Sequence, residues 1–105
     1  MKVFIAQSSG LTEKVLLYSK SHPEYDCYVP LLQTNQGGTE EEILKQNLDA
    51  MKTCDEIHVF WDLSSLGTIF DLGMAYALGK PIKIIYTKNH HWVKFIEKKR
   101  GGYLV

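Results

Sequence analysis

The chain has 105 residues, of which 45% are hydrophobic and 23% are charged, as is typical of one globular domain. Its twelve basic and twelve acidic residues balance, so we expect neither polymeric nucleic acid nor a membrane surface as a partner. Two isolated cysteines, with no metal-ligand cluster and no signal-peptide or membrane-spanning run, favour a reduced, cytoplasmic protein without a metal or cofactor.

The first third of the chain predicts a strand, a helix and a second strand. Residues 2–6 are a short apolar run of strand formers, and the polar run 7–10 breaks it. A helix follows, with Gly10 placed as its cap and Pro23 as its stop. Its apolar residues at helical spacing are Leu11, Val15 and Tyr18. Residues 27–30 predict the second strand.

A polar loop over residues 33–38 leads to a clearly marked helix start. Thr39 as N-cap and Glu42 at the third helical position form a capping box, and the acidic first turn suits the positive end of the helix dipole. We expect this helix to bury Ile43, Leu44, Leu48 and Met51. Residues 56–61 then predict a third strand.

The last third predicts a buried helix, a fourth strand and a basic tail. Residues 66–78 are apolar on nearly every face, as expected of a helix inside the protein, and Gly79 suits its C-terminal cap. Pro81 blocks continuation of the helix, and residues 82–86 predict the fourth strand. The basic amphipathic stretch from Thr87 is interpreted as a helix.

Strands that alternate with helices indicate βαβ units joined by right-handed crossovers. We therefore expect an α/β domain with a mainly parallel sheet of four to five strands. Ligands of such sheets bind outside the carboxyl ends of the strands. This rule selects three loops as candidate ligand sites, at residues 7–10, 31–38 and 62–67.

Two polar residues fall where apolar residues are expected. Asp71 is the only charged residue between Asp62 and Lys80, and a carboxylate in an apolar helix is costly unless it is paired or borders a cavity. The helix dipole favours its ionised form, whereas burial raises its pKa. The alternative is a partly exposed aspartate that stabilises the helix start. Asn47, on the apolar stripe of its own helix, either bonds to backbone in the core or faces a pocket.

The first and third of these loops carry small hydroxyl residues and glycine. Backbone N–H groups at the start of a helix can bind an anion such as a phosphate, although the same residues are also ordinary N-caps. Neither loop has the phosphate-binding Walker pattern, and the glycine spacing does not fit the dinucleotide fingerprint. The candidate ligand-binding residues are Ser8, Ser9, Gly10, Asp62, Ser65 and Gly67.

The run from Gly67 to Pro81 is the most specific part of the sequence, with Gly-Thr-Ile-Phe-Asp-Leu-Gly followed by Ala-Tyr-Ala-Leu-Gly-Lys-Pro. Together with the segment that starts at Asn47, it resembles the nucleoside 2-deoxyribosyltransferase superfamily. The Ser-Leu-Gly of residues 65–67 is most similar to the 2′-deoxynucleoside 5′-phosphate N-hydrolases. The opening strand and its Ser-Ser-Gly loop, at residues 3–10, fit the same group.

This resemblance implies a three-layer, flavodoxin-like domain over residues 1–105 and a homodimer whose partner subunit helps to close the pocket. It implies cleavage of the N-glycosidic bond of a deoxynucleoside or its 5′-monophosphate, by hydrolysis rather than transfer, through a covalent glycosyl-enzyme. Asp71 takes the place of the nucleophile, which is typically Glu in the family. Asn47 takes the place of a carboxylate that positions the sugar, and Ser65 and residues 8–10 take the place of the phosphate site.

Two other functions remain open. This chain has Asp71 where the family typically has Glu, and Asn47 where the family has a carboxylate. Both differences are compatible with a nucleotide sensor that has lost turnover. A third possibility is the related fold of the Toll/interleukin-receptor-like NAD hydrolases. In each case, the expected partner is a small nucleoside or nucleotide.

Overall fold

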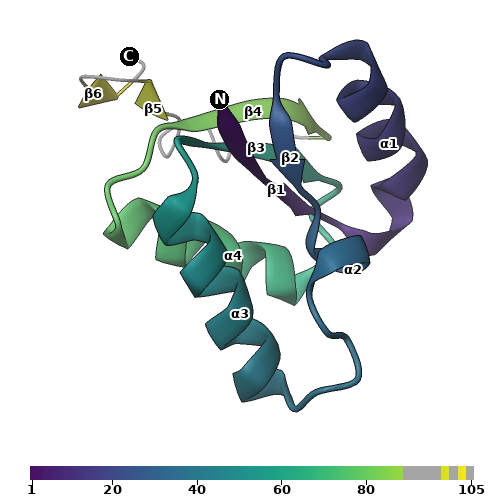
Figure 1. The fold of residues 1–105 in the computed structure, drawn as a ribbon, viewed down its shortest axis with the longest axis vertical. Helices are drawn as coiled ribbons and strands as arrows, with labels where there is room; N and C mark the ends of the chain where they lie inside the picture. The colour runs from purple at the N-terminus through teal and green to yellow at the C-terminus, as the bar shows by residue number, and fades with distance from the viewer. Residues whose placement is uncertain (89–97, 100–101, 104–105) are drawn as a thin grey trace.

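The computed structural model describes residues 1–88, 98–99 and 102–103. Strands and helices alternate through most of this part of the chain (Figure 1). In chain order, the elements are β1 (Lys2–Gln7), the 3-10 helix η1 (Ser9–Leu11), α1 (Thr12–Ser21), β2 (Asp26–Tyr28), α2 (Pro30–Gln33), α3 (Glu40–Thr53), β3 (Glu56–Trp61), α4 (Leu66–Ala77), β4 (Ile82–Thr87), β5 (Lys98–Lys99) and β6 (Gly102–Tyr103).

The sheet has the strand order β2-β1-β3-β4-β5-β6. Its first four strands are parallel, which confirms the predicted α/β class with a mainly parallel sheet. The two-residue strands β5 and β6 add antiparallel pairs beyond β4, so the described sheet has six strands rather than the predicted four to five.

The sheet separates two hydrophobic clusters because alternate residues of each strand point to opposite faces. Phe4 and Ala6 of β1 pack in the cluster that includes residues of α3 and α4. Val3 and Ile5 pack in the cluster that includes Val15 of α1. The helices thus cover both faces of the sheet, as Figure 1 shows, with α1 on one side and α3 and α4 on the other.

The predicted helix start at Thr39 is confirmed. Its hydroxyl accepts a hydrogen bond from the backbone N–H of Glu42 at 3.2 Å, and its own N–H donates to the Glu42 carboxylate, also at 3.2 Å. Both partners of the capping box are therefore in place. The two hydrogen bonds also lower the pKa of Glu42. Of the four residues expected to be buried by this helix, Met51 is fully buried, whereas Ile43, Leu44 and Leu48 are half-buried.

Two boundaries predicted in the first third are wrong. Gly10 does not cap α1, because it lies inside the short helix η1 and α1 begins at Thr12. Pro30 does not end β2, because it opens α2, where its fixed φ and missing N–H suit the first helical position.

The prediction that α4 is largely buried is wrong for one of its faces. Its inner face buries Thr68, Asp71, Leu72 and Ala75. Its outer face leaves 82% of Leu66, 46% of Ile69 and 52% of Phe70 exposed. Among the described residues nothing covers this apolar surface, and sequence alone does not show what covers a helix.

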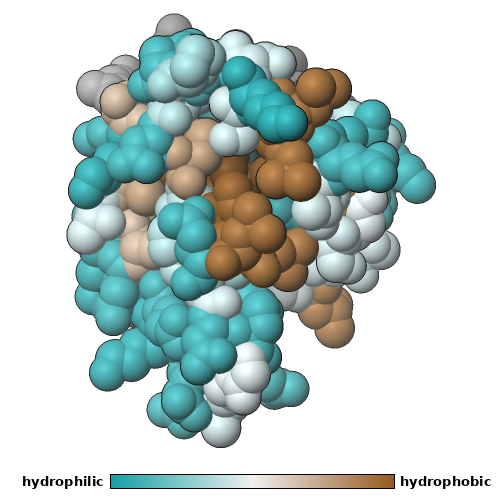
Figure 2. All heavy atoms as spheres, turned by 45° about the vertical axis from the view of Figure 1, so that its right-hand side comes forward, coloured by the Kyte–Doolittle hydropathy of each residue, from teal (hydrophilic) through white to brown (hydrophobic). Residues whose placement is uncertain are grey.

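Exposed apolar side chains are also found on α1 and α2. Figure 2, in which the side of α1 and α2 in Figure 1 is turned forward, shows hydrophobic surface gathered near the middle of this face and bordered by hydrophilic residues. Both helices carry exposed leucines, namely Leu16 and Leu17 on α1 and Leu31 and Leu32 on α2.

The predicted C-terminal helix is wrong wherever the structure describes that region. Thr87 belongs to β4, and residues 98–99 and 102–103 form the strands β5 and β6. The rest of that prediction falls on residues 89–97, 100–101 and 104–105, which lie outside the described part of the chain. Within the described residues, the helices are too short or too polar to cross a membrane.

Candidate functional site

A cleft of about 230 Å³ lies at the carboxyl end of β1, where α2, α3 and the start of α4 meet. Each of the three loops expected to hold a ligand contributes to its wall: Ser9 from the first, Leu31 and Gln36 from the second, and Ser65 and Gly67 from the third. The position agrees with the general placement of ligands in open parallel sheets. Both polar residues singled out from the sequence, Asn47 and Asp71, also line the cleft.

Asp71 is a buried carboxylate on the inner face of α4. Only 8% of its surface is exposed, and its Oδ1 atom has no hydrogen-bond partner. Burial raises the pKa of Asp71 from 3.8 to about 7, and a side-chain hydrogen bond with Asn47 acts in the opposite direction. Among the described residues that line the cleft, Asp71 is the only ionisable one, so no cation offsets the cost of burying its charge.

Asn47 is buried beside Asp71, and 5% of its surface is exposed. Its Oδ1 atom accepts a hydrogen bond of 2.7 Å from the hydroxyl of Thr34. The amide therefore bonds to side chains at both ends, one of them the Asp71 carboxylate. Of the two interpretations left open by the sequence, the pocket-facing one agrees with this placement.

Gln7 also lines the cleft and carries a second buried acceptor without a hydrogen-bond partner. Its Nε2 atom donates to the Ser8 carbonyl oxygen and to the Thr12 hydroxyl, each at 3.2 Å. Its Oε1 atom is buried and has no hydrogen-bond partner. Two buried acceptors, Gln7 Oε1 and Asp71 Oδ1, thus lack partners on residues that line one small cleft, although buried acceptors normally have a hydrogen-bond partner.

The predicted loop residues divide into two groups. Ser9, Ser65 and Gly67 line the cleft, and Ser65 caps α4 by accepting a hydrogen bond from the backbone N–H of Thr68 at 3.3 Å. A Cβ atom added to Gly67 would meet nothing closer than the Ser65 hydroxyl at 3.8 Å, so the backbone here is open to a ligand.

Ser8, Gly10 and Asp62 are not among the residues that line the cleft. Ser8 is fully buried, and its hydroxyl accepts from the Asp62 N–H at 3.1 Å, which joins the ends of β1 and β3. The Asp62 carboxylate accepts hydrogen bonds from the N–H and hydroxyl of Ser64, and these bonds lower its pKa. These residues shape the loops beside the cleft.

Gln7, Thr34 and Thr68 belong to the site but were not candidates from the sequence. Thr68 is 1% exposed, and its hydroxyl donates to the Gln7 carbonyl at 2.7 Å, which fixes the first turn of α4 to the end of β1. Its position three residues before Asp71 was a usable signal, because residues at that spacing share a helix face. Gln7 and Thr34 lie in two of the loops selected from the sequence, at 7–10 and 31–38, but neither residue was singled out, since contacts distant in sequence give them their roles.

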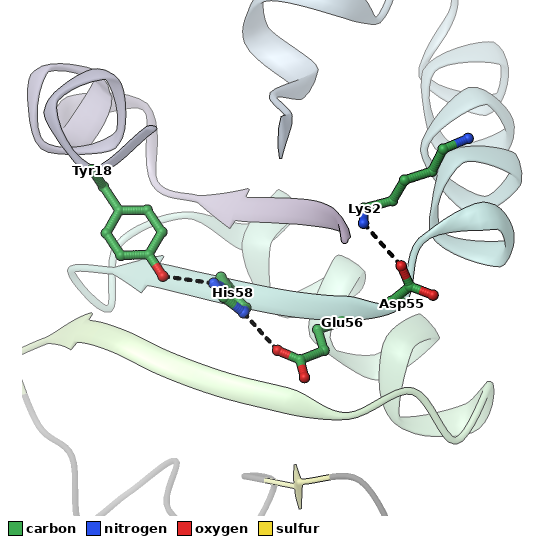
Figure 3. Close-up of polar contacts among 5 residues, drawn as sticks. All are labelled: Lys2, Tyr18, Asp55, Glu56 and His58. Atoms are coloured by element: carbon green, nitrogen blue, oxygen red, sulfur yellow. Dashed lines mark hydrogen bonds and ion pairs between the residues drawn. The ribbon is translucent and has the colours of Figure 1, made fainter. Parts of the chain in front are cut away.

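A second polar cluster lies on the other face of the sheet (Figure 3). The fully buried His58 bonds through Nδ1 to the Tyr18 hydroxyl at 2.8 Å and through Nε2 to the Glu56 carboxylate at 2.9 Å. Since a carboxylate only accepts, Nε2 carries the proton and Nδ1 accepts from Tyr18. Burial lowers the pKa of His58, and burial raises the pKa of Tyr18. Both ring nitrogens are occupied, which indicates a structural role.

The same view shows a contact that joins the starts of β1 and β3. The backbone N–H of Lys2 donates to the Asp55 carboxylate at 2.9 Å, and the Asp55 N–H donates to the Lys2 carbonyl at 2.8 Å. Asp55 therefore has the turn role that its position between a helix and a strand indicates.

Comparisons of the sequence and of the fold with known proteins agree with each other. The family described as nucleoside 2-deoxyribosyltransferase matches residues 2–102. A search of curated protein sequences finds no match.

Three solved structures show the same fold. A 2-deoxyribosyltransferase from Bacillus psychrosaccharolyticus has a TM-score of 0.68 at 20% identity, over 85% of this chain and 75% of that one. The Clostridium botulinum CMP N-glycosidase BcmB has a TM-score of 0.63 at 22% identity, over 91% of this chain and 80% of that one. A 2-deoxyribosyltransferase from Leishmania mexicana has a TM-score of 0.62 at 25% identity, over 96% and 75%.

Proposed function

The chain belongs to the nucleoside 2-deoxyribosyltransferase family, and from this we propose that it cleaves the N-glycosidic bond of deoxynucleosides or their 5′-monophosphates. Hydrolysis is favoured over transfer, on the similarity of Ser65, Leu66 and Gly67 to the nucleotide N-hydrolases. The observation that carries the proposal is Asp71 Oδ1, a buried carboxylate oxygen without a hydrogen-bond partner on a residue that lines a cleft. A buried carboxylate oxygen left without a partner at a cleft, on a group whose pKa is shifted, is typical of a residue that takes part in a reaction.

In the proposed reaction, Asp71 acts as the nucleophile. One carboxylate oxygen forms a bond to the anomeric carbon of the sugar while the C–N bond breaks, and the electron pair of that bond leaves with the base, which takes up a proton. Water then attacks the same carbon and releases the sugar, and the carboxylate is regenerated. The net change is one water consumed, with free base and free sugar formed.

Asn47 and Gln7 complete the proposed sugar site. The Asn47 amide hydrogen-bonds to Asp71 and favours its ionised form, which is the form that attacks. The unpartnered Gln7 Oε1 accepts from a sugar hydroxyl. We assign the 5′ end of the substrate to the neighbouring Ser9, Ser65 and Gly67, whose loops lie at helix starts.

We also propose that the protein is a homodimer joined through the outer face of α4. An apolar groove of about 450 Å³, lined by Leu66, Phe70 and residues of α3, runs between α3 and α4. It shares Ile43, Leu44 and Gly67 with the cleft, so a second copy seated on it would also cover one side of the substrate. Of the exposed leucines of α1 and α2, only Leu31 lines the cleft, and none of them lines this groove.

A second candidate function is a nucleotide sensor without turnover. The observation in its favour is the pKa of Asp71, since a carboxyl group with a pKa of about 7 is only partly ionised at neutral pH. A sensor would bind the same ligands in the same cleft and release no base.

The decisive experiment is incubation of the purified protein with each deoxynucleoside and each 5′-monophosphate, followed by chromatography of the free base. Base release that disappears in Asp71→Asn and persists in Asp49→Asn, an exposed aspartate of α3, supports the glycosidase. Calorimetric binding without base release supports the sensor. Base release that survives in Asp71→Asn would overturn the assignment of the nucleophile.

A further inference from the structure

Four side chains from four parts of the chain form one hydrogen-bonded series that ends at the cleft. Tyr28, at the end of β2, bonds through its hydroxyl to that of Thr34 at 2.6 Å, directly after α2. Thr34 bonds to Asn47 of α3 at 2.7 Å, and Asn47 bonds to Asp71 of α4. Thr34, Asn47 and Asp71 are all at least nine-tenths buried, so water does not compete for these hydrogen bonds.

The direction of each hydrogen bond in this series follows from the donors available. The Oδ1 atom of Asn47 can only accept, so the single proton of the Thr34 hydroxyl is donated to it. Thr34 must then accept from Tyr28, whose hydroxyl is the remaining donor. The NH2 group of Asn47 is consequently the end of the amide that is left for Asp71.

The opposite orientation of the amide would be unfavourable at both ends. It would place the Asn47 oxygen against the carboxylate of Asp71, so that two acceptors face each other. It would also leave Thr34 without an acceptor for its proton, unless both hydroxyls of the series turned. The hydroxyl of Thr34 therefore selects the amide orientation that supports an ionised Asp71.

We propose that Thr34 and Tyr28 are positioning residues, which fix the amide of Asn47 so that its NH2 group donates to the Asp71 carboxylate. This inference rests on the proposed function, in which the ionised carboxylate is the attacking group. Tyr28 is itself held by the ring of Phe4, stacked at 5.6 Å between centroids, so the series begins at the sheet.

Other charges do not provide this support in the described part of the chain. The other polar side chains that line the cleft are not ionisable at neutral pH, namely Gln7, Ser9, Gln36, Asn47, Ser65 and Thr68. The ionised form of Asp71 is thus favoured by a neutral donor, the NH2 group of Asn47. This group can donate to Asp71 only in one orientation of the Asn47 amide.

The test is an NMR titration of the Asp71 side-chain carboxyl carbon in the wild type and in Thr34→Val, Thr34→Ser and Tyr28→Phe. We expect the Asp71 pKa to rise by about 0.5 to 1 in Thr34→Val and by less in Tyr28→Phe. Thr34→Ser keeps a hydroxyl and should restore the wild-type value. Tyr25→Phe, which removes a half-buried hydroxyl outside the series, is the matched control and should change nothing.

Base release gives a second readout that depends on pH. The kcat of Thr34→Val should fall about two- to fivefold at pH 7 and nearly return to the wild-type value at pH 9, where Asp71 is ionised in both proteins. A loss that came only from damaged packing would persist at pH 9.

An unchanged Asp71 pKa in folded Thr34→Val, or a Thr34→Ser variant that behaves like Thr34→Val, would overturn the proposal. If Thr34→Val does not fold, Tyr28→Phe leaves the buried part of the series in place and still decides the question by the same titration. If the wild type releases no base from any substrate, the proposed function fails, whereas the titration still decides the positioning role.

Discussion

Asp71 Oδ1 and Gln7 Oε1 are two buried oxygen atoms without hydrogen-bond partners on residues that line the same cleft. Each lowers the stability of the ligand-free fold, because a buried acceptor without a donor has lost its water and gained nothing. A bound molecule with hydroxyl donors would satisfy both. The cleft is therefore suited to a ligand such as a sugar, at the expense of the stability of the empty protein.

The first prediction concerns the stability cost of Asp71. Its pKa is raised from 3.8 to about 7 in the folded state, so its contribution to stability is fully present below pH 3.8 and is lost as pH rises toward 7. Asp71→Asn does not titrate. We compare the free energies of unfolding of Asp71→Asn and the wild type at each pH. Between pH 4 and pH 8, we expect this difference to change by a few kcal/mol in favour of the variant.

Urea denaturation of both proteins at pH 4 and pH 8 measures this difference, and the contributions of all other titrating groups cancel between them. Asp49→Asn, at an exposed aspartate of α3, is the matched control for the loss of a carboxylate. A difference between wild type and Asp71→Asn that stays constant across the range would show that Asp71 is not destabilised by ionisation.

The second prediction concerns His58. Burial lowers its pKa, and the hydrogen bond to the Glu56 carboxylate is the largest effect in the opposite direction. Removing that carboxylate in Glu56→Gln should lower the pKa of His58 further, because the charged imidazole loses its counter-charge. NMR titration of the imidazole protons provides the measurement. An upward change in the pKa of His58 would contradict the assigned geometry.

The third prediction concerns the capping box of α3. Thr39→Ala removes the acceptor for the Glu42 N–H and should lower the free energy of unfolding by about 1 kcal/mol. Thr39→Ser retains the acceptor and should lose only a small part of this. Urea denaturation decides the matter, and equal losses in the two variants would mean that the threonine methyl group, rather than the cap, is responsible.

The fourth prediction concerns the outer face of α4. If this face joins two copies, Ile69→Glu should convert the dimer to a monomer, because it places a charge in an apolar contact. Light scattering after size-exclusion chromatography measures the mass. Leu17→Glu, at an exposed leucine of α1, is the matched control. If only Leu17→Glu produced a monomer, the interface would involve α1 rather than α4. A monomeric wild type would contradict the proposed homodimer.

Local sequence signals determined the parts of the fold that were predicted well. The strand at Glu56–Trp61 and the helix start at Thr39 agree with the prediction, since each depends on residues next to one another in the chain. Asn47 and Asp71 were also candidates, because a polar side chain on an apolar stripe is visible without a structure. That both line one cleft was expected only through the family resemblance.

The parts that were not predicted depend on contacts between distant segments. Thr34 belonged to a polar loop and gained its role from Asn47, thirteen residues away. The exposed face of α4 was predicted to be buried, because hydropathy shows that a surface is apolar and not what lies against it. The start of α2 at Pro30 was missed, since a proline after apolar residues suits a strand end as well as a helix start.

A buried histidine and a buried aspartate lie on opposite sides of the sheet, His58 beside α1 and Asp71 on the inner face of α4. As pH falls below about 6.5, His58 takes up a proton less readily in the fold than in the unfolded chain, which weakens the fold, whereas over the same range Asp71 takes one up more readily, which strengthens it. The effects of mild acid on the two sides of the sheet are therefore opposite. Protonation lowers the stability of the fold through His58 and raises it through Asp71. A protein lacking His58 should therefore gain more stability in mild acid than the intact one, whereas a protein lacking Asp71 should lose the part of the stability that acid adds.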